Sequence, residues 1–173
     1  MNVVSSFDVD RFILAARNYV AWCESPHIDD DPDEFRLATL SRLAELYAAA
    51  QGLPDVPADD GPDVPEEERP GLRDELMANL APMPFQLYWE TLDPTNLSEI
   101  DNTGCGDIFD DLLDIHSNIS DGLWLLDQGY RNDAIWNWRL LYFHWGEHAI
   151  NAMRALHLYE PVAKLTDSSI EDA

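Results

Sequence analysis

The sequence has 173 residues and a formal net charge of −24, from 34 acidic and 10 basic side chains. This length suits one hydrophobic core, and a hydrophobic content of 46% is not that of a disordered chain. Contacts with nucleic-acid backbones and with anionic membrane surfaces need lysine and arginine, so this acidity argues against direct nucleic-acid binding and against membrane-surface binding. No apolar run approaches the roughly 20 residues of a membrane span.

Two features favour a cytoplasmic location. The N-terminus has no basic region followed by an apolar stretch, so we expect no secretory signal. Cys23 and Cys105 are too few for a disulfide framework, which favours a reducing compartment.

Hydrophobic residues recur at three- and four-residue spacing through most of the chain, and this spacing predicts helices. The first helix begins at Ser5-Ser6-Phe7-Asp8, which resembles a capping box, and ends before Pro26. The second begins near Asp33 and stops at Gly52 and Pro54. The predicted buried faces are Phe12, Ala15, Ala16, Tyr19 and Cys23 in the first helix, and Leu37, Leu40, Ala44 and Tyr47 in the second.

Residues 53–70 form an acidic, proline-rich segment with seven acids and five prolines. Proline removes backbone donors and like charges repel, so we predict an extended loop. A loop of this length is either mobile or a docked functional loop, and we favour the mobile alternative. The loop lies within a single domain of residues 1–173, because the first 52 residues alone would form a marginal core.

The second half of the chain predicts short helices near residues 73–80 and 85–91, then long helices near 107–127 and 132–159. Gln128-Gly129-Tyr130-Arg131 between the long helices is typical of an antiparallel helix pair. No alternating run indicates a sheet, so we interpret Gly104-Cys105-Gly106 as a flexible segment before a helix. We predict an all-α, single-domain bundle around the long Trp-rich C-terminal helix, with Trp138 and Trp145 buried.

The two long predicted helices also carry a recognisable pattern. It comprises Asp110-Asp111-Leu112-Leu113-Asp114-Ile115, Gly122-Leu123-Trp124-Leu125-Leu126-Asp127, Trp136, Trp138, His144-Trp145-Gly146, His148 and His157, with Tyr88-Trp89-Glu90 and Asp93-Pro94 upstream. Over residues 7–158 this pattern resembles the bacterial family known as domain of unknown function 5063. The resemblance implies a helical bacterial domain and no established activity.

His144 and His148 are four residues apart, which places both imidazoles on one side of a helix, as two ligands of one metal require. Asn137 and Asn151 lie in the same polar strip. The alternative interpretation is a pair of half-buried histidines that bond to carbonyls or carboxylates at the edge of the core.

A second polar strip, the Asp strip, follows one face of the preceding helix: Asp107, Asp111, Asp114, Asn118 and Asp121. A solvated acidic face explains Asp107 well and explains Asp111 and Asp114 less well. If the turn is centred near Gly129, Asp114 is level with His144, and Asp111 is nearly level with His148. We therefore predict at least one Asp–His contact across the helix pair. We also expect Arg131, Arg139 and Arg154 to pair with the Asp strip.

Two functions remain open. The favoured one is a non-enzymatic protein-interaction or regulatory domain, whose charge would steer a basic protein partner toward it. No nucleophile–base set or cofactor motif is visible, so we expect no organic cofactor and lean against an enzyme. The alternative is a metal-dependent helical-bundle enzyme that holds a divalent ion with Asp111, Asp114, His144 and His148.

Overall fold

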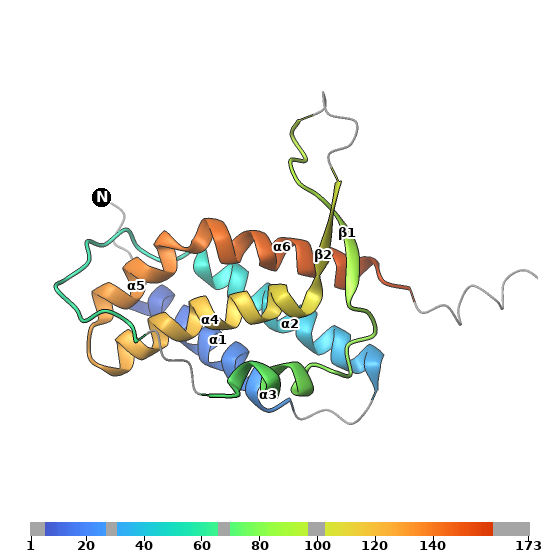
Figure 1. Ribbon diagram of the computed structural model, residues 1–173. Helices are drawn as coiled ribbons and strands as arrows, with labels where there is room; N and C mark the ends of the chain where they lie inside the picture. The colour runs from blue at the N-terminus through green and yellow to red at the C-terminus, as the bar shows by residue number, and fades with distance from the viewer. Residues whose placement is uncertain (1–5, 27–30, 66–69, 97–102, 161–173) are drawn as a thin grey trace, which may run out of the picture.

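The computed structural model (Figure 1) describes residues 6–26, 31–65, 70–96 and 103–160. Within these ranges the chain forms six helices and one two-stranded antiparallel sheet. The elements are α1 (Ser6–Glu24), α2 (Pro32–Ala50), α3 (Leu72–Asn79), β1 (Leu87–Thr91), β2 (Thr103–Asp107), α4 (Ile108–Asp127), α5 (Arg131–Leu140) and α6 (Tyr142–Leu158). The predicted helical fold class is confirmed. None of the described helices is long and apolar enough to cross a membrane.

Four helices form a ring around the core, because α1 contacts α2 and α4, and α6 contacts the same two helices. After the turn at Gly129, where φ is +93°, α5 packs back along α4 and leads into α6. The short helix α3 lies against α1 and α4. The hairpin of β1 and β2 projects from the bundle beside α6 (Figure 1).

The centre of the core is aromatic, as predicted. Trp138 and Trp145 are both fully buried. The ring of Phe12 packs 4.8 Å from that of Trp138, and the indole Nε1 of Trp138 donates to the carbonyl of Ile119, 3.1 Å away. A hydrogen bond from the indole N–H offsets the cost of removing this group from water, which allows so large a ring to be buried.

The prediction of one continuous helix over residues 132–159 is wrong, because the structure divides it at Leu141. In an uninterrupted helix, the carbonyl of Trp138 would accept the N–H of Tyr142. Here that carbonyl accepts the indole Nε1–H of Trp145, at 3.0 Å. A side chain that enters the backbone ladder in this way breaks a helix, so the burial of Trp145 accounts for the division.

The predicted helix over residues 85–91 is also wrong, as is the prediction that no sheet forms. Residues Leu87–Thr91 are strand β1, and the segment interpreted as flexible, Gly104-Cys105-Gly106, is the middle of β2. Aromatic and β-branched residues favour strands, and here Tyr88, Trp89 and Thr91 lie within one. The two glycines of β2 lie opposite large side chains of β1, which hides the strand signal in the sequence.

The predicted buried face of α1 is confirmed, whereas that of α2 is confirmed only in part, because Leu40 and Tyr47 are half-buried against the core while Leu37 and Ala44 are exposed. The side chains of α2 that face the core are Phe35, Arg36, Thr39, Leu43, Leu46, Ala49 and Ala50, and Leu37 is 50% exposed. Apolar residues occur on several sides of this helix, so spacing alone did not select the correct face. The predicted capping residue Ser5 lies outside the described residues.

The described part of the acidic loop, residues 53–65, contains no helix or strand, in agreement with the predicted extended loop. It nevertheless has fixed contacts with α5. Leu53 is buried, the side-chain amide of Asn132 donates to Asp59 at 3.0 Å, and the N–H of Gly61 donates to Asp133 at 3.3 Å. The expectation that this loop is the least ordered internal segment stays a prediction.

Candidate functional site

The predicted contact between the Asp strip and the histidines is confirmed at Asp111 and His148. The Nδ1 atom of His148 lies 2.7 Å from Oδ1 of Asp111, and its Nε2 atom lies 3.6 Å from Oδ2 of Asp114. The two aspartates are on α4 and the histidine is on α6, which are neighbours in the ring. Asp111 lies 18 residues before Gly129 and His148 lies 19 residues after it, so the antiparallel pair brings these two side chains to nearly the same height.

Asp111 is the buried centre of the site, with only 5% of its surface exposed. It lies in the first turn of α4, where the helix dipole favours a carboxylate. Its Oδ2 accepts the hydroxyl of Tyr88 at 2.5 Å, while Oδ1 contacts His148. A buried carboxylate requires such partners, so Asp111 holds β1, α4 and α6 together.

The glycines of β2 make room for the side chains of β1 that reach the site. Tyr88 pairs with Gly106 in the sheet register, and Glu90 pairs with Gly104. A Cβ atom on Gly106 would lie 2.3 Å from Cζ of Tyr88, and one on Gly104 would lie 3.0 Å from Oε1 of Glu90. Their absence lets Tyr88 reach Asp111 and lets Glu90 accept a hydrogen bond from Asn151 of α6 at 3.1 Å.

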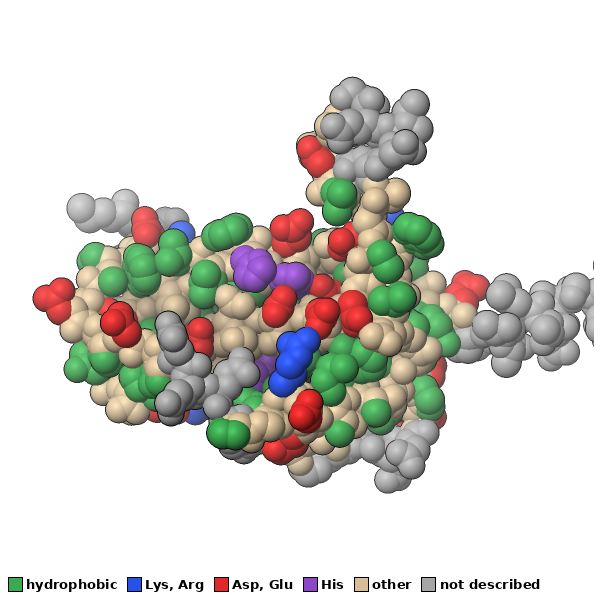
Figure 2. All heavy atoms as spheres, in the orientation of Figure 1, with side chains coloured by type: hydrophobic (Ala, Val, Ile, Leu, Met, Phe, Trp, Pro, Cys, Tyr) green, Lys and Arg blue, Asp and Glu red, His purple; other side chains and the backbone are tan. Residues whose placement is uncertain are grey.

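Asp114, His144 and His148 form the outer part of the site. One potential ligand atom from each of the three lies within 4.8 Å of the others. The two imidazole rings meet edge to face, with centroids 4.7 Å apart. In Figure 2, histidine side chains lie beside a group of acidic side chains on the face formed by α4 and α6. We call this set, with Asp111, the Asp/His cluster.

The electrostatics follow from these contacts. The hydrogen bond to Asp111 is the largest cause that raises the pKa of His148 above 6.5; burial opposes it, and the negative charges of Asp111, Asp114 and Glu147 reinforce it. Burial raises the pKa of the Tyr88 phenol well above its usual value, and the bond to Asp111 adds to the shift. Tyr88 therefore stays neutral and acts as a donor to Asp111.

Four of the six candidate residues predicted from sequence come together in the cluster. Asn151 is connected to the neighbouring hairpin through Glu90. Asn137 is on α5, before the break at Leu141, and its buried Oδ1 has no hydrogen-bond partner in the described part of the chain. Tyr88 and Glu90 were not predicted as site residues, although Tyr88-Trp89-Glu90 was part of the recognised pattern.

The expected pairing of arginines with the Asp strip is wrong for Arg131 and Arg139. Arg131 pairs with Asp10 of α1 at 2.8 Å, and Arg139 donates to the carbonyl of Leu53 at 2.7 Å. Both arginines are on α5, and their partners lie on α1 and at the start of the acidic loop. Within the described residues, Asp111 bonds Tyr88 and His148, and Asp114 lies beside His148. The expected pairing of Arg154 stays a prediction.

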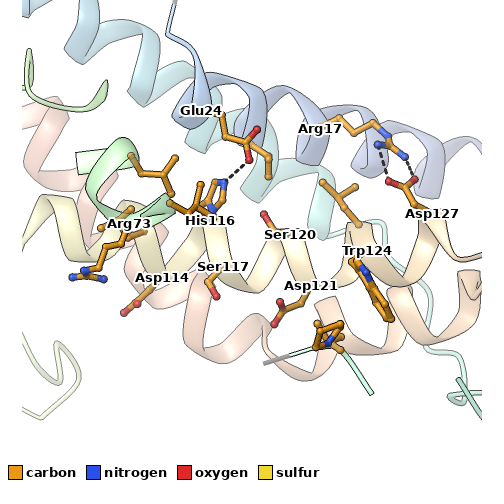
Figure 3. A pocket seen from close by; sticks show the side chains of 17 residues that line it. Arg17, Glu24, Arg73, Asp114, His116, Ser117, Ser120, Asp121, Trp124 and Asp127 are labelled. Atoms are coloured by element: carbon orange, nitrogen blue, oxygen red, sulfur yellow. Dashed lines mark hydrogen bonds and ion pairs between the residues drawn. The ribbon is translucent and has the colours of Figure 1, made fainter. Parts of the chain in front are cut away.

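A second cavity, of about 570 Å³, is lined by residues of α1, α3 and α4 and by Val64 and Pro65 of the acidic loop (Figure 3). Arg17 bonds Asp127 at 2.5 Å on one side of it, and Nε2 of His116 lies 3.3 Å from Oε1 of Glu24 on another. Asp114 also lines the cavity, so the cavity and the Asp/His cluster share one side chain. Sequence spacing did not predict the cavity, because its walls come from segments far apart in the chain.

The fold and the site define a class: a helical-bundle protein whose buried carboxylate orients a histidine beside a short hairpin. The chain belongs to the family described as Domain of unknown function (DUF5063), which matches residues 5–160, as the sequence resemblance predicted. It is similar to the crystal structure of protein BF1032 from Bacteroides fragilis, with a TM-score of 0.65 and 26% identity over 90% of this chain and 95% of that chain. No protein with a curated description matches the sequence.

Proposed function

We propose that this protein binds a divalent transition-metal ion through Asp114, His144 and His148. The observation that carries the proposal is the use of both ring nitrogens of His148. Its Nδ1 is bonded to Asp111 at 2.7 Å, and its Nε2 lies 3.6 Å from the carboxylate of Asp114. Two ligands at about 2.1 Å from one tetrahedral ion lie about 3.4 Å apart, so this pair needs little movement to chelate an ion.

Asp111 supports the same proposal from the other side of the ring. A histidine that binds a metal usually donates its second ring N–H to a carboxylate, which fixes the tautomer and the ring orientation. Asp111 occupies that position, and Tyr88 holds Asp111 in turn. We assign Asp111 to this outer role, and Asp114, His144 and His148 to the ion itself.

Two imidazoles and one carboxylate favour zinc, iron(II) and similar transition metals over magnesium and calcium, which prefer oxygen ligands. Three protein ligands also leave at least one position for water or a further ligand, unlike a closed structural site. The ion would therefore keep one coordination position at which water or another small ligand can exchange. Such an open position is equally compatible with a regulatory site and with a catalytic site.

The test is metal content. Untagged protein is stripped with a chelator, dialysed against zinc chloride and then against buffer, and analysed for zinc per chain. We expect one ion per chain, and loss of this ion in Asp114→Asn and in His144→Gln. His157→Gln near the end of α6 and Asp110→Asn on the exposed side of α4 are matched controls that should retain it.

Two results contradict the proposal: stripped wild-type protein that takes up no stoichiometric zinc, or uptake that persists in both Asp114→Asn and His144→Gln. Either result would indicate that the Asp/His cluster has a structural role through its hydrogen bonds and is not a metal site. Circular dichroism of each variant separates the loss of a ligand from the loss of the fold.

A second candidate function is a protein-interaction domain that performs no chemistry. The observation that favours it is the exposure of aromatic side chains, 80% for Trp89 and 75% for Phe143. Neither residue belongs to the Asp/His cluster, so the two functions are compatible. A cytoplasmic location is part of the proposal, and the unpaired state of Cys23 and Cys105 supports it.

A further inference from the structure

Exposed hydrophobic side chains gather where the hairpin meets α6. Eleven large hydrophobic side chains are exposed among the described residues, and six of them line two clefts between α6 and residues 85–94. The clefts have volumes of about 400 Å³ and 480 Å³. We call these six side chains the hairpin–α6 surface: Leu87, Trp89 and Leu158 in one cleft, and Leu92, Phe143 and Ile150 in the other.

The two clefts adjoin, because Asn151 and Arg154 line both of them. Hydrophobic side chains are visible along the hairpin and at its base in Figure 2. Isolated exposed hydrophobic residues are ordinary, whereas a contiguous set in paired clefts marks an interaction surface. Tryptophan and other large aromatic side chains are also typical of the residues that dominate binding energies. This surface therefore has the composition of a binding site for an apolar partner.

The net negative charge of the protein favours a positively charged partner. The chain carries 34 acids against 10 bases, and ion pairs already engage five of the arginines with carboxylates: Arg17, Arg36, Arg42, Arg73 and Arg131. At the clefts themselves, Glu147 lines one and Glu90 the other, with Arg154 between them. The excess charge that a partner meets is negative.

We infer that the hairpin–α6 surface binds a cationic amphipathic helix of another protein. The apolar face of such a helix fills the two clefts, and its lysines and arginines meet Glu147 and the surrounding acidic field. Long-range attraction accelerates the encounter, and the apolar contacts supply most of the affinity. A second copy of this chain is the less favourable occupant, because it would bring together two bodies that each carry a net charge of −24. This inference rests on the second candidate function, the protein-interaction domain, and does not depend on the proposed metal site.

The probe is a synthetic helix of about 18 residues, or about five turns, with leucine on one face and lysine on the other. One control peptide replaces the leucines with serine and keeps the charge. A second keeps the leucine face and replaces the lysines with glutamate. Fluorescence anisotropy of labelled peptide, at two salt concentrations, measures the affinity of the full-length protein.

We expect the leucine–lysine helix to bind at least about tenfold more tightly than either control peptide. Trp89→Ala and Phe143→Ala should each weaken its binding about tenfold or more. Leu14→Ala on α1 and Leu37→Ala on α2 are matched controls, since both side chains are exposed and neither lines a cleft. Glu147→Lys should weaken binding and reduce its salt dependence, whereas Glu45→Lys on α2 should have a smaller effect.

Three outcomes would overturn the inference. Equal affinity for the serine–lysine peptide would mean that charge alone attracts cations. Unchanged affinity in Trp89→Ala and Phe143→Ala would place binding elsewhere. A dimer in sedimentation that dissociates in the Trp89→Ala, Phe143→Ala double variant would show that a second copy covers the surface. All the substituted side chains are exposed, so circular dichroism should confirm an intact fold in each variant.

Discussion

Gly122 of α4 provides the space into which the indole of Trp138 packs. A Cβ atom at Gly122 would lie 2.1 Å from Nε1 of Trp138, far inside any permitted contact. The indole belongs to the most deeply buried part of the core, so it has no free space into which it could move. The approach of α5 to α4 thus depends on the absence of one methyl group.

Gly122→Ala should consequently destabilise the protein, although alanine is the better helix former. Overpacking of a close-packed core costs about 1–3 kcal/mol, which exceeds the helix-propensity gain of about 1 kcal/mol. The free energy of unfolding from urea titration measures the effect. Ser117→Ala, at an exposed position on the same helix, should change it by less than about 0.5 kcal/mol. Equal stability of the two variants would contradict the packing argument.

Trp138→Ala and Trp145→Ala should each lower the free energy of unfolding by about 3–5 kcal/mol, because each leaves a large cavity in the core. The matched control is Trp136→Ala, whose indole is 41% exposed and should lose far less. Thermal unfolding followed by circular dichroism ranks the three variants. A Trp136→Ala variant as unstable as Trp138→Ala would refute the assignment of the core.

Tyr88→Phe should act through Asp111. The substitution removes the hydroxyl that donates to Oδ2, and a buried carboxylate that loses a hydrogen bond costs about 1–3 kcal/mol. In the metal-binding assay, the same change should weaken zinc affinity by about tenfold, because loss of an outer-shell partner typically costs about 10–100-fold. Tyr130→Phe, at the more exposed turn between α4 and α5, is the control. Loss of stability with unchanged zinc affinity would separate Tyr88 from the ion site.

The stability of metal-free protein should depend on pH through His148. Its pKa is raised in the folded state by the bond to Asp111, so the folded protein binds the proton more tightly than the unfolded chain. This stabilisation is fully present below 6.5, the ordinary value, and is lost as the pH rises through the folded-state pKa. The excess stability of wild type over His148→Gln should therefore be larger at about pH 5 than at about pH 9. If the excess stability is the same at both pH values, protonation of His148 does not contribute to the stability of the fold.

Limited proteolysis with a protease specific for acidic residues should cleave within residues 53–70 before it cleaves the helices. The described part of this loop lacks helix and strand hydrogen bonds, and it is held by Leu53, Val56 and Val64, which pack against the core, and by a few hydrogen bonds to α5. Exposed backbone without helix or strand hydrogen bonds opens at a lower free energy than the helices do. Mass spectrometry of early fragments identifies the first cut. Persistent protection of this segment would indicate a docked functional loop.

Residue spacing located α1, α2, α3 and α4 and one contact of the site, but it missed the strand β1 and the division between α5 and α6. The spacing of Asp111 and His148 about Gly129 predicted their contact, because a tight turn brings residues at nearly equal distances from it to similar heights, and the break at Leu141 does not remove this contact. The contribution of the hairpin could not be predicted in that way. Tyr88 reaches Asp111 only because Gly106 lies opposite it in the sheet. The hydrophobic periodicity of a single strand does not reveal which residues of a second strand pair with it.

The failure at Asn137 has a different physical origin. Asn137 and His144 share a strip only if the helix continues unbroken between them. The bond from the indole of Trp145 to the carbonyl of Trp138 interrupts the ladder at that point, so positions before and after it no longer follow one 3.6-residue period. The bond from the buried indole of Trp145 to a carbonyl seven residues earlier depends on tertiary packing. Helical periodicity in the sequence therefore could not predict it.

Asp111 meets Tyr88 and His148 across sequence separations of 23 and 37 residues. Asp114 meets His144 and His148 only when α4 and α6 are packed together. Asp111 and Tyr88 orient His148 only when β1 is also in place, so the unfolded chain has no oriented ion site. Any ion held at the cluster would thus bind the native state selectively, and mass action would add its binding free energy to the stability of the fold. At a free-ion concentration one hundred times the dissociation constant, the gain is about 2.7 kcal/mol. The melting temperature would then report the metal supply of the surroundings.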